Sequence, residues 1–228
     1  MAVHKIIEDS MPPIAGVANG AMILRDKILE DMTIEEMHTV INPKVLGSMN
    51  LHNIFRTTRL DFFILLSSAI GITGNVGQCN YAIANLYMHG LAAQRRKNGL
   101  AASVIVIGVI LGVGYVTRET SQSLQENLKR SGHTWMSEQD FHTLFAEAIR
   151  DGSAASPFQS EIISGLKSPR EDDDHLPPWH SNPRFSHLII RSQESGSSTS
   201  AGHEKIPLKT QFLEAQSHAG LHEIFRGT

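Results

Sequence analysis

Cysteine is almost absent from this sequence, and its scarcity narrows the chemistry open to the protein. The 228 residues contain one cysteine, Cys79. A single thiol cannot form an internal disulfide framework, and it cannot supply a cysteine-rich zinc site. We therefore expect the chain to function in a reducing compartment, and we predict a cytoplasmic location.

A large excess of charge of either sign is also missing. The formal net charge is −3, so the composition offers no electrostatic attraction to nucleic acid or to an anionic membrane. Residues 1–10 break their apolar run too early for a signal peptide. Residues 100–116 are uncharged but shorter than the roughly 20 apolar residues of a membrane span. We predict a buried strand and a glycine-rich turn there, in a soluble protein with neither a nucleic-acid nor a membrane partner.

Histidine is plentiful, but no metal-ligand pattern accompanies it. The twelve histidines are scattered, and no pair has the spacing of an HExxH or Cys/His ligand set. We therefore predict no metal site. The acidic run at residues 171–174 fits a solvated linker better than paired catalytic acids. The basic run at residues 95–97 fits a helix C-terminus better than a phosphate-binding patch.

Apolar runs alternate with helical patterns up to about residue 165. We expect strands at residues 12–18, 61–68, 102–107 and 161–166, and helices at 33–55, 81–97, 121–130 and 137–150. Residues 69–78 form a glycine-containing loop in this interpretation. The order of strands and helices predicts a parallel α/β sheet.

Local signals refine three of the expected helices. Thr33 and Glu36 have the spacing of a capping box at the start of helix 33–55, and Pro43 should kink that helix or divide it. Residues 137–140 cap helix 137–150 in the same way. Helix 81–97 is expected to place one apolar side inward, formed by Ile83, Leu86, Tyr87 and Leu91.

The composition changes after residue 167, and we divide the chain there. Residues 1–167 form the main domain, and residues 168–191 pack back on its surface through Trp179, Pro183 and Phe185. Residues 192–205 are a polar, flexible linker, and residues 206–228 are a helical segment that approaches a further domain. We expect this tail to be disordered or loosely packed.

One group of polar residues suits carbonyl chemistry. Ser68 ends a buried strand, where open α/β sheets place their active sites, and Tyr81 and Asn85 lie one turn apart on the next helix. A phenol can donate a proton to a ketone oxygen while a serine hydroxyl hydrogen-bonds it, and Lys44 could supply a cation that favours tyrosinate. From spacing alone, an ordinary strand end followed by an ordinary helix remains the better explanation.

A second possible signal is a set of three glycines in the loop after that strand. Gly71, Gly74 and Gly77 follow the strand as in nucleotide-binding loops, but their spacing differs from GxGxxG, so the indication is weak.

The same residues resemble a known family. Ser68 with the run Tyr81-Ala-Ile-Ala-Asn85 resembles the ketoreductase (KR) domain of polyketide synthases, in the short-chain dehydrogenase/reductase superfamily. Residues 16–26, 43–52, 66–81 and 178–187 are similar to the fungal highly reducing synthases, and the resemblance covers roughly residues 5–190. Most of the superfamily has lysine at the position of Asn85, whereas polyketide ketoreductases have asparagine there and a lysine on the preceding helix.

The resemblance implies a reaction and a site. It implies NADPH-dependent reduction of a β-ketoacyl (3-oxoacyl) thioester held on an acyl carrier protein, with other polyketide synthase domains as further partners. The implied catalytic residues are Lys44, Ser68, Tyr81 and Asn85. The implied cofactor-binding residues are Asn19, Gly20 and Ala21 near the ribose, together with Lys44 and Tyr81.

The sequence departs from the family at its N-terminal side. The glycine-rich turn that holds the cofactor phosphates in the family does not occur in these residues. We therefore expect a partial Rossmann-like sheet that lacks its N-terminal strands, leaves the strand of Val17 as an unprotected edge, and binds little NADPH alone. The alternative is a non-catalytic remnant, or an interaction module associated with a polyketide synthase.

Overall fold

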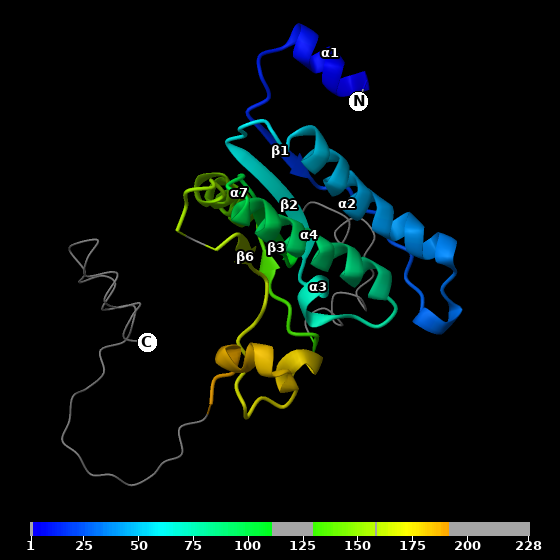
Figure 1. Ribbon diagram of the computed structural model, residues 1–228. Helices are drawn as coiled ribbons and strands as arrows, with labels where there is room; N and C mark the ends of the chain where they lie inside the picture. The colour runs from blue at the N-terminus through cyan, green and yellow to red at the C-terminus, as the bar shows by residue number, and fades with distance from the viewer. Residues whose placement is uncertain (1, 111–129, 158, 192–228) are drawn as a thin grey trace, which may run out of the picture. The chain divides into compact units, whose positions relative to one another are not determined.

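Strands and helices alternate along the chain in this computed structural model, which describes residues 2–110, 130–157 and 159–191 (Figure 1). The helices are α1 (Ala2–Ser10), α2 (Ile34–Ile54), α3 (Ile70–Thr73), α4 (Cys79–Lys97) and α7 (Glu138–Asp151). The strands are β1 (Gly16–Asn19), β2 (Phe62–Ser68), β3 (Ser103–Ile107), β4 (Val109–Ile110), β5 (Trp135–Met136) and β6 (Glu161–Ile163). Short 3-10 helices are η1 (Leu29–Asp31), η2 (Pro178–Ser181) and η3 (Pro183–Leu188).

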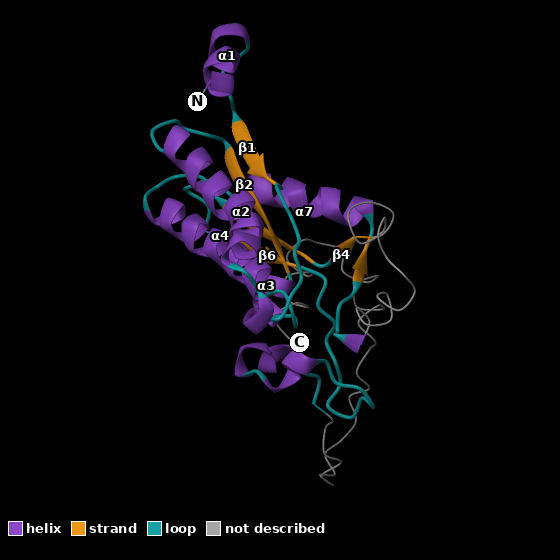
Figure 2. Ribbon diagram, turned by 90° about the vertical axis from the view of Figure 1, so that its right-hand side faces the viewer, coloured by secondary structure: helices purple, strands orange, loops and turns teal. Residues whose placement is uncertain are grey.

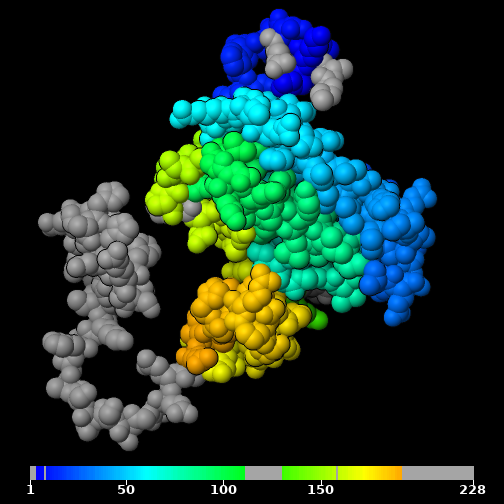
Figure 3. Space-filling model, viewed as in Figure 1, coloured from blue at the N-terminus to red at the C-terminus, as the bar shows by residue number. Residues whose placement is uncertain are grey.

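Four of the strands form one parallel sheet in the order β1-β2-β3-β6. Helices α2 and α4 cover one face and α7 covers the other, as Figure 2 shows. On the α2/α4 side, α4 packs against α2, and the two lie next to each other in the space-filling view of Figure 3. The predicted α/β class with a parallel sheet is confirmed.

The central strand β2 contributes to a core on both faces of the sheet. Phe63 and Leu65 pack towards the cluster that contains Met88, whereas Ile64 belongs to the cluster that contains Ala148 of α7. Alternate residues of a strand point to opposite faces, so a continuous apolar run is what a doubly covered strand requires. The predicted strand at residues 61–68 therefore agrees closely with β2.

Both predicted capping boxes are present. Thr33 Oγ1 accepts a hydrogen bond from the Glu36 N–H at 3.2 Å, and a Glu36 carboxylate oxygen accepts one from the Thr33 N–H at 2.8 Å. Ser137 and Asp140 make the equivalent pair of bonds at the start of α7. Each box supplies partners for main-chain N–H groups that have no intrahelical acceptor.

The predicted elements need four corrections. The first strand begins at Gly16, because Pro12 and Pro13 have no N–H to give to a sheet. The loop predicted at residues 69–78 contains the short helix α3, and α4 begins at Cys79 rather than at residue 81. Strand β6 ends at Ile163, earlier than the predicted residue 166.

The predicted inward face of α4 is wrong for two of its four residues. Ile83 is 50% exposed and Leu86 is 45% exposed. The buried face is formed by Asn80, Tyr81, Ala84, Asn85, Met88, Leu91, Ala92 and Arg95. Polar side chains occupy this face because each finds a partner inside the protein. Apolar periodicity alone cannot reveal such partners.

Arg95 is the largest of these buried polar groups. Its Nε donates to the Ala101 carbonyl at 3.0 Å, its Nη1 lies 3.0 Å from His52 Nδ1, and its guanidinium stacks 3.8 Å from the centre of the Phe63 ring. Burial lowers the pKa of Arg95 to about 10. The basic run thus ends the helix as predicted, and its first member is fully buried.

Pro43 does not divide the second helix. Helix α2 runs from Ile34 to Ile54 as one assigned element with Pro43 inside it. A proline in a helix interior costs about 3 kcal/mol relative to alanine, so packing must offset that cost. Val40, Lys44 and Ser48 are buried along this helix, and α2 packs on α4 and β1.

Residues after β6 pack through two aromatic rings. The Trp179 and Phe185 ring centres lie 5.1 Å apart, both side chains are buried, and Trp179 Nε1 donates to the Ser131 carbonyl at 3.0 Å. The acidic run makes local ion pairs, including Asp172 with Arg170 at 3.1 Å.

Two sequence predictions lie outside the described residues, the linker at 192–205 and the helical segment at 206–228, and of the predicted helix at 121–130 only Arg130 is described. No helix within the described ranges is long and apolar enough to cross a membrane.

Candidate functional site

Tyr81 lies in the first turns of α4, near the carboxyl ends of β1 and β2. Its side chain is buried, and its hydroxyl donates to the Met22 thioether at 3.2 Å. Burial raises the pKa of Tyr81 above its ordinary value, and the neighbouring polar side chains of Asn85 and Ser68 act in the opposite direction. The phenol is therefore protonated at neutral pH and able to act as an acid.

Lys44 reaches this tyrosine from α2. Its ammonium nitrogen lies 5.5 Å from the centre of the Tyr81 ring and donates to the Leu66 carbonyl at 2.8 Å. The residue is 3% exposed, and desolvation lowers the pKa of Lys44 to about 8. A cation held at this position favours the deprotonated form of the neighbouring phenol.

Ser68 and Asn85 complete the group predicted from the sequence. Ser68 ends β2, and its hydroxyl accepts a hydrogen bond from the Ile70 N–H at 3.3 Å. Asn85 Nδ2 donates to the Tyr81 main-chain carbonyl at 2.7 Å, and no partner for the buried Asn85 Oδ1 occurs among the described residues. The fold thus brings Lys44, Ser68, Tyr81 and Asn85 together from three elements.

The predicted cofactor-side segment lies where β1 ends. Asn19 is buried; its Nδ2 donates to Ser48 Oγ at 2.9 Å, and its Oδ1 accepts from the Ala21 N–H at 3.1 Å. These bonds attach the end of β1 to α2. The Asn19 side chain therefore shapes the start of the segment that follows β1.

Two partners in this group were not predicted from the sequence: Met22, which accepts from the Tyr81 hydroxyl, and Leu66, which accepts from Lys44. Met22 gives no signal, because a methionine after a strand is compatible with ordinary packing. Leu66 contributes a main-chain carbonyl, which no side-chain pattern can report.

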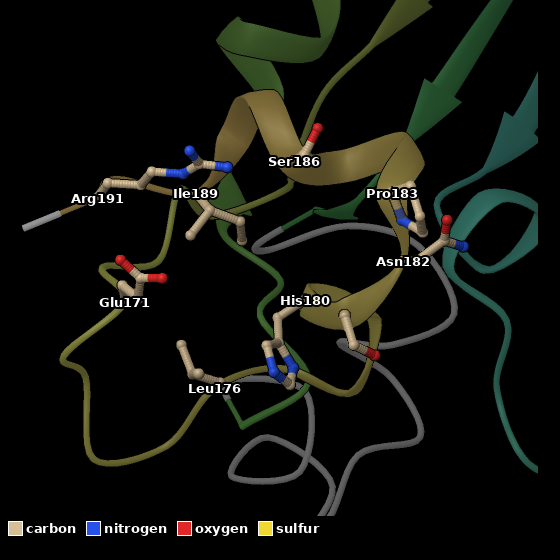
Figure 4. Close-up of a pocket in the computed structure, with 9 residues that line it drawn as sticks. Glu171, Leu176, His180, Asn182, Pro183, Ser186, Ile189 and Arg191 are labelled. Carbon is tan, nitrogen blue, oxygen red and sulfur yellow. The ribbon is translucent and has the colours of Figure 1, made fainter.

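A surface hollow lies elsewhere, in the segment after β6 (Figure 4). It is lined by Glu171, Leu176, His180, Ser181, Asn182, Pro183, Ser186, Ile189 and Arg191. None of these residues is Lys44, Ser68, Tyr81 or Asn85, so the hollow is separate from the group predicted from the sequence.

The residues present fit part of a nicotinamide cofactor. The Lys44 ammonium has three N–H donors and gives one to Leu66, which leaves donors suited to ribose hydroxyls. The described residues do not fit a metal ion in the same way, since no cluster of three His, Cys, Asp or Glu residues occurs among them.

A parallel sheet with helices on both faces, and polar residues at the carboxyl ends of its strands, defines a Rossmann-like protein of the short-chain dehydrogenase/reductase type. Residues 1–112 match the family model of the KR domain. This match confirms the predicted resemblance to the ketoreductase (KR) domain for these residues.

Fungal megasynthases are among the relatives. Hybrid PKS-NRPS synthetase poxE of Penicillium oxalicum is 48% identical over 225 residues, which are 98% of this chain and 6% of that protein. Highly reducing polyketide synthase calA of Penicillium decumbens is 42% identical over 228 residues, 99% of this chain and 8% of that protein. The chain therefore spans a small fraction of the length of these relatives.

Solved ketoreductases share the fold. The structure of A-type ketoreductases from a modular polyketide synthase matches with a TM-score of 0.63 and 25% identity, covering 72% of this chain and 34% of that one. The first ketoreductase of the tylosin PKS matches with a TM-score of 0.60 and 28% identity over the same shares.

Proposed function

We propose that this chain carries the proton-donating part of a β-ketoreductase that reduces a 3-oxoacyl thioester on an acyl carrier protein, with NADPH as the reductant. The observation that carries the proposal is the buried Lys44 ammonium 5.5 Å from the Tyr81 ring. The match of residues 1–112 to the KR family model and the polyketide synthases among the relatives support it.

The mechanism assigns one task to each residue. NADPH, when bound, supplies a hydride to the ketone carbon. Tyr81 donates its phenolic proton to the developing alkoxide, and the Ser68 hydroxyl donates a hydrogen bond to the same oxygen. The Lys44 cation then stabilises the tyrosinate. Asn85 holds the first turns of α4 through its bond to the Tyr81 carbonyl.

Substrate entry requires a rearrangement at Met22. The Tyr81 hydroxyl is bonded to the Met22 sulfur, at the position that a substrate oxygen must take to receive the proton. A thioether is a weak acceptor, so a ketone oxygen can replace it at little cost. Met22 is 39% exposed, which leaves its side chain room to turn away.

The experiment uses the full chain. We expect isothermal titration to detect no micromolar NADPH binding by the chain alone, since its sequence has no glycine-rich phosphate turn. Adding a separate ketoreductase fragment that carries that turn should restore reduction of a 3-oxoacyl thioester. Tyr81→Phe should lower the restored rate at least about 100-fold, because proton transfer contributes about that much. Tyr87→Phe is the matched control on the same helix.

One experimental result would contradict the proposal. A mixture that binds NADPH and reduces the thioester equally well with Tyr81→Phe would show that the proton comes from another group.

A second candidate is an interaction module without turnover. Its support is β1, which pairs on one side only within the described sheet. A stable complex with the ketoreductase fragment, without any NADPH oxidation, would favour this candidate over the first.

A further inference from the structure

A histidine joins two strands of the sheet beside the proposed site. His89 Nε2 lies 3.0 Å from Ser67 Oγ of β2, and His89 Nδ1 lies 3.0 Å from a carboxylate oxygen of Glu161 in β6. We call Ser67, His89 and Glu161 the His89 bridge. Strand β3 lies between β2 and β6 in the sheet, so His89 on α4 reaches across β3 to contact both of its neighbours.

The bridge determines which ring nitrogen carries a proton. A carboxylate can only accept, so Nδ1 must be the donor to Glu161. In the neutral ring, Nε2 then accepts a hydrogen bond from the Ser67 hydroxyl. The pattern of atoms is that of a serine, histidine and acid triad.

Burial argues against a nucleophilic role for this serine. Ser67 is 3% exposed, and the His89 side chain is 12% exposed. An acyl carbon would have to reach the serine oxygen through the contact between α4 and the sheet. The geometry is therefore better suited to holding elements in place than to attacking a substrate.

The place of the bridge in the fold shows what it holds. Tyr81, Asn85 and His89 follow one another at intervals of one helical turn on α4. Ser67 is the neighbour of Ser68 on β2. A bond between His89 and Ser67 thus sets the register of the helix that carries the phenol against the strand that carries Ser68.

We propose that the His89 bridge positions Tyr81 against Ser68, with Glu161 fixing the ring of His89 in the orientation that binds Ser67. The catalytic meaning of this positioning rests on the proposed reductase function. The positioning itself is a property of the folded chain and can be measured without cofactor or substrate.

Two variants separate the two contacts of the ring. His89→Gln can place a polar atom near the position of Nε2 and so keep the contact with Ser67. His89→Asn can place one near Nδ1 and so keep only the contact with Glu161. We expect His89→Gln to preserve the position of Tyr81 relative to Ser68 and His89→Asn to lose it.

The readout is the titration of the Tyr81 phenol in the full chain, followed by NMR of ¹³C-labelled tyrosine and assigned with Tyr81→Phe. The Ser68 side chain beside the phenol acts to lower the pKa of Tyr81, so a displaced Ser68 in His89→Asn should raise the titration midpoint. His89→Gln should leave it unchanged. His142→Gln is the control, because His142 pairs with Glu138 on an exposed face of α7.

Several results would overturn the proposal. Equal midpoints in His89→Asn and the wild type would do so, and so would labelling of Ser67 by a fluorophosphonate, which would mark it as a nucleophile. If a variant does not fold, ¹⁵N NMR of the wild-type His89 ring tests the bridge itself, since it reports which ring nitrogen carries the proton. A ring without a proton on Nδ1 cannot make the bridge.

Activity provides a separate comparison. In the complemented reductase, His89→Asn should lower kcat about tenfold with KM nearly unchanged, because misplaced reacting groups slow the chemical step. Suppose that His89→Asn raises the Tyr81 midpoint as expected but the complemented wild type shows no reductase activity. That result would reject the proposed function and leave the positioning role intact. An unchanged Tyr81 midpoint in His89→Asn, with an active complemented wild type, would reject the positioning role alone.

Discussion

At the scale of single residues, the site keeps a buried ammonium that is unfavourable for folding. Lys44 is 3% exposed, and its bond to the Leu66 carbonyl replaces only part of its lost hydration. Replacing a buried charge with an apolar side chain of similar size often stabilises a protein. The position of Lys44 is therefore explained by chemistry better than by stability.

Lys44→Met should raise the free energy of unfolding at pH 7 by about 1–3 kcal/mol. The pKa of Lys44 is about 8 in the folded protein and near 10.5 when unfolded. Between these values the unfolded chain holds a proton that the folded chain has lost, so the wild type gains stability as the pH rises. Urea unfolding from pH 7 to 10.5 should show the variant's advantage shrinking, and an advantage that grows with pH would contradict this account.

Met22 covers the phenol, and its removal should be visible in the titration of Tyr81. Burial is the largest cause of the raised pKa of Tyr81, so Met22→Ala should lower the midpoint towards 10. Met49→Ala is the control, because Met22 and Met49 are both 39% exposed. A midpoint that both variants leave unchanged would show that the methionine does not shield the hydroxyl.

The sequence predicted the residues that meet at the site better than the contacts they make. Ser68 and Tyr81 could be located because a strand end and a helix start have recognisable patterns. The Leu66 carbonyl and the Met22 sulfur could not, because neither leaves a mark in residue type or spacing. His89 looked like one of many scattered histidines, and its partners come from strands far apart in the sequence.

At the scale of elements, the contact between α3 and α4 leaves no space for a methyl group. A Cβ at Gly71 would lie 2.8 Å from Asn85 Cβ, whereas a Cβ at Gly90 would meet nothing within 4 Å. Gly71→Ala should therefore cost about 1–3 kcal/mol, and Gly90→Ala on α4 should stabilise the protein by up to about 1 kcal/mol. Thermal unfolding measures both changes, and equal effects of the two substitutions would contradict the close packing.

Helix starts were predictable, and helix faces were not. Both capping boxes involve residues three positions apart, so the chain itself records them. The buried face of α4 depends on partners from other elements, such as the Ala101 carbonyl for Arg95. For the same reason Pro43 could be accommodated, because its helix is supported by neighbours that the local sequence does not show.

At the scale of the whole molecule, β1 is an edge of the described sheet. Unpaired N–H and C=O groups along an edge favour pairing with another strand. We expect concentration-dependent self-association, and Ala18→Lys on the exposed side of β1 should weaken it about tenfold. Sedimentation velocity measures the effect, with Ala93→Lys on α4 as the charge-matched control. An equal loss in both variants would indicate a general effect of charge.

The grouping of the site on α2, β2 and α4 also has a consequence for the order of folding. Lys44, Ser68, Tyr81 and Asn85 come from elements that follow one another in the sequence, so their contacts close short loops. Strand β6 can pair with β3 only after a much longer loop has closed. The contacts among these four residues should therefore form early, and the Glu161 end of the His89 bridge should be among the last contacts to become native.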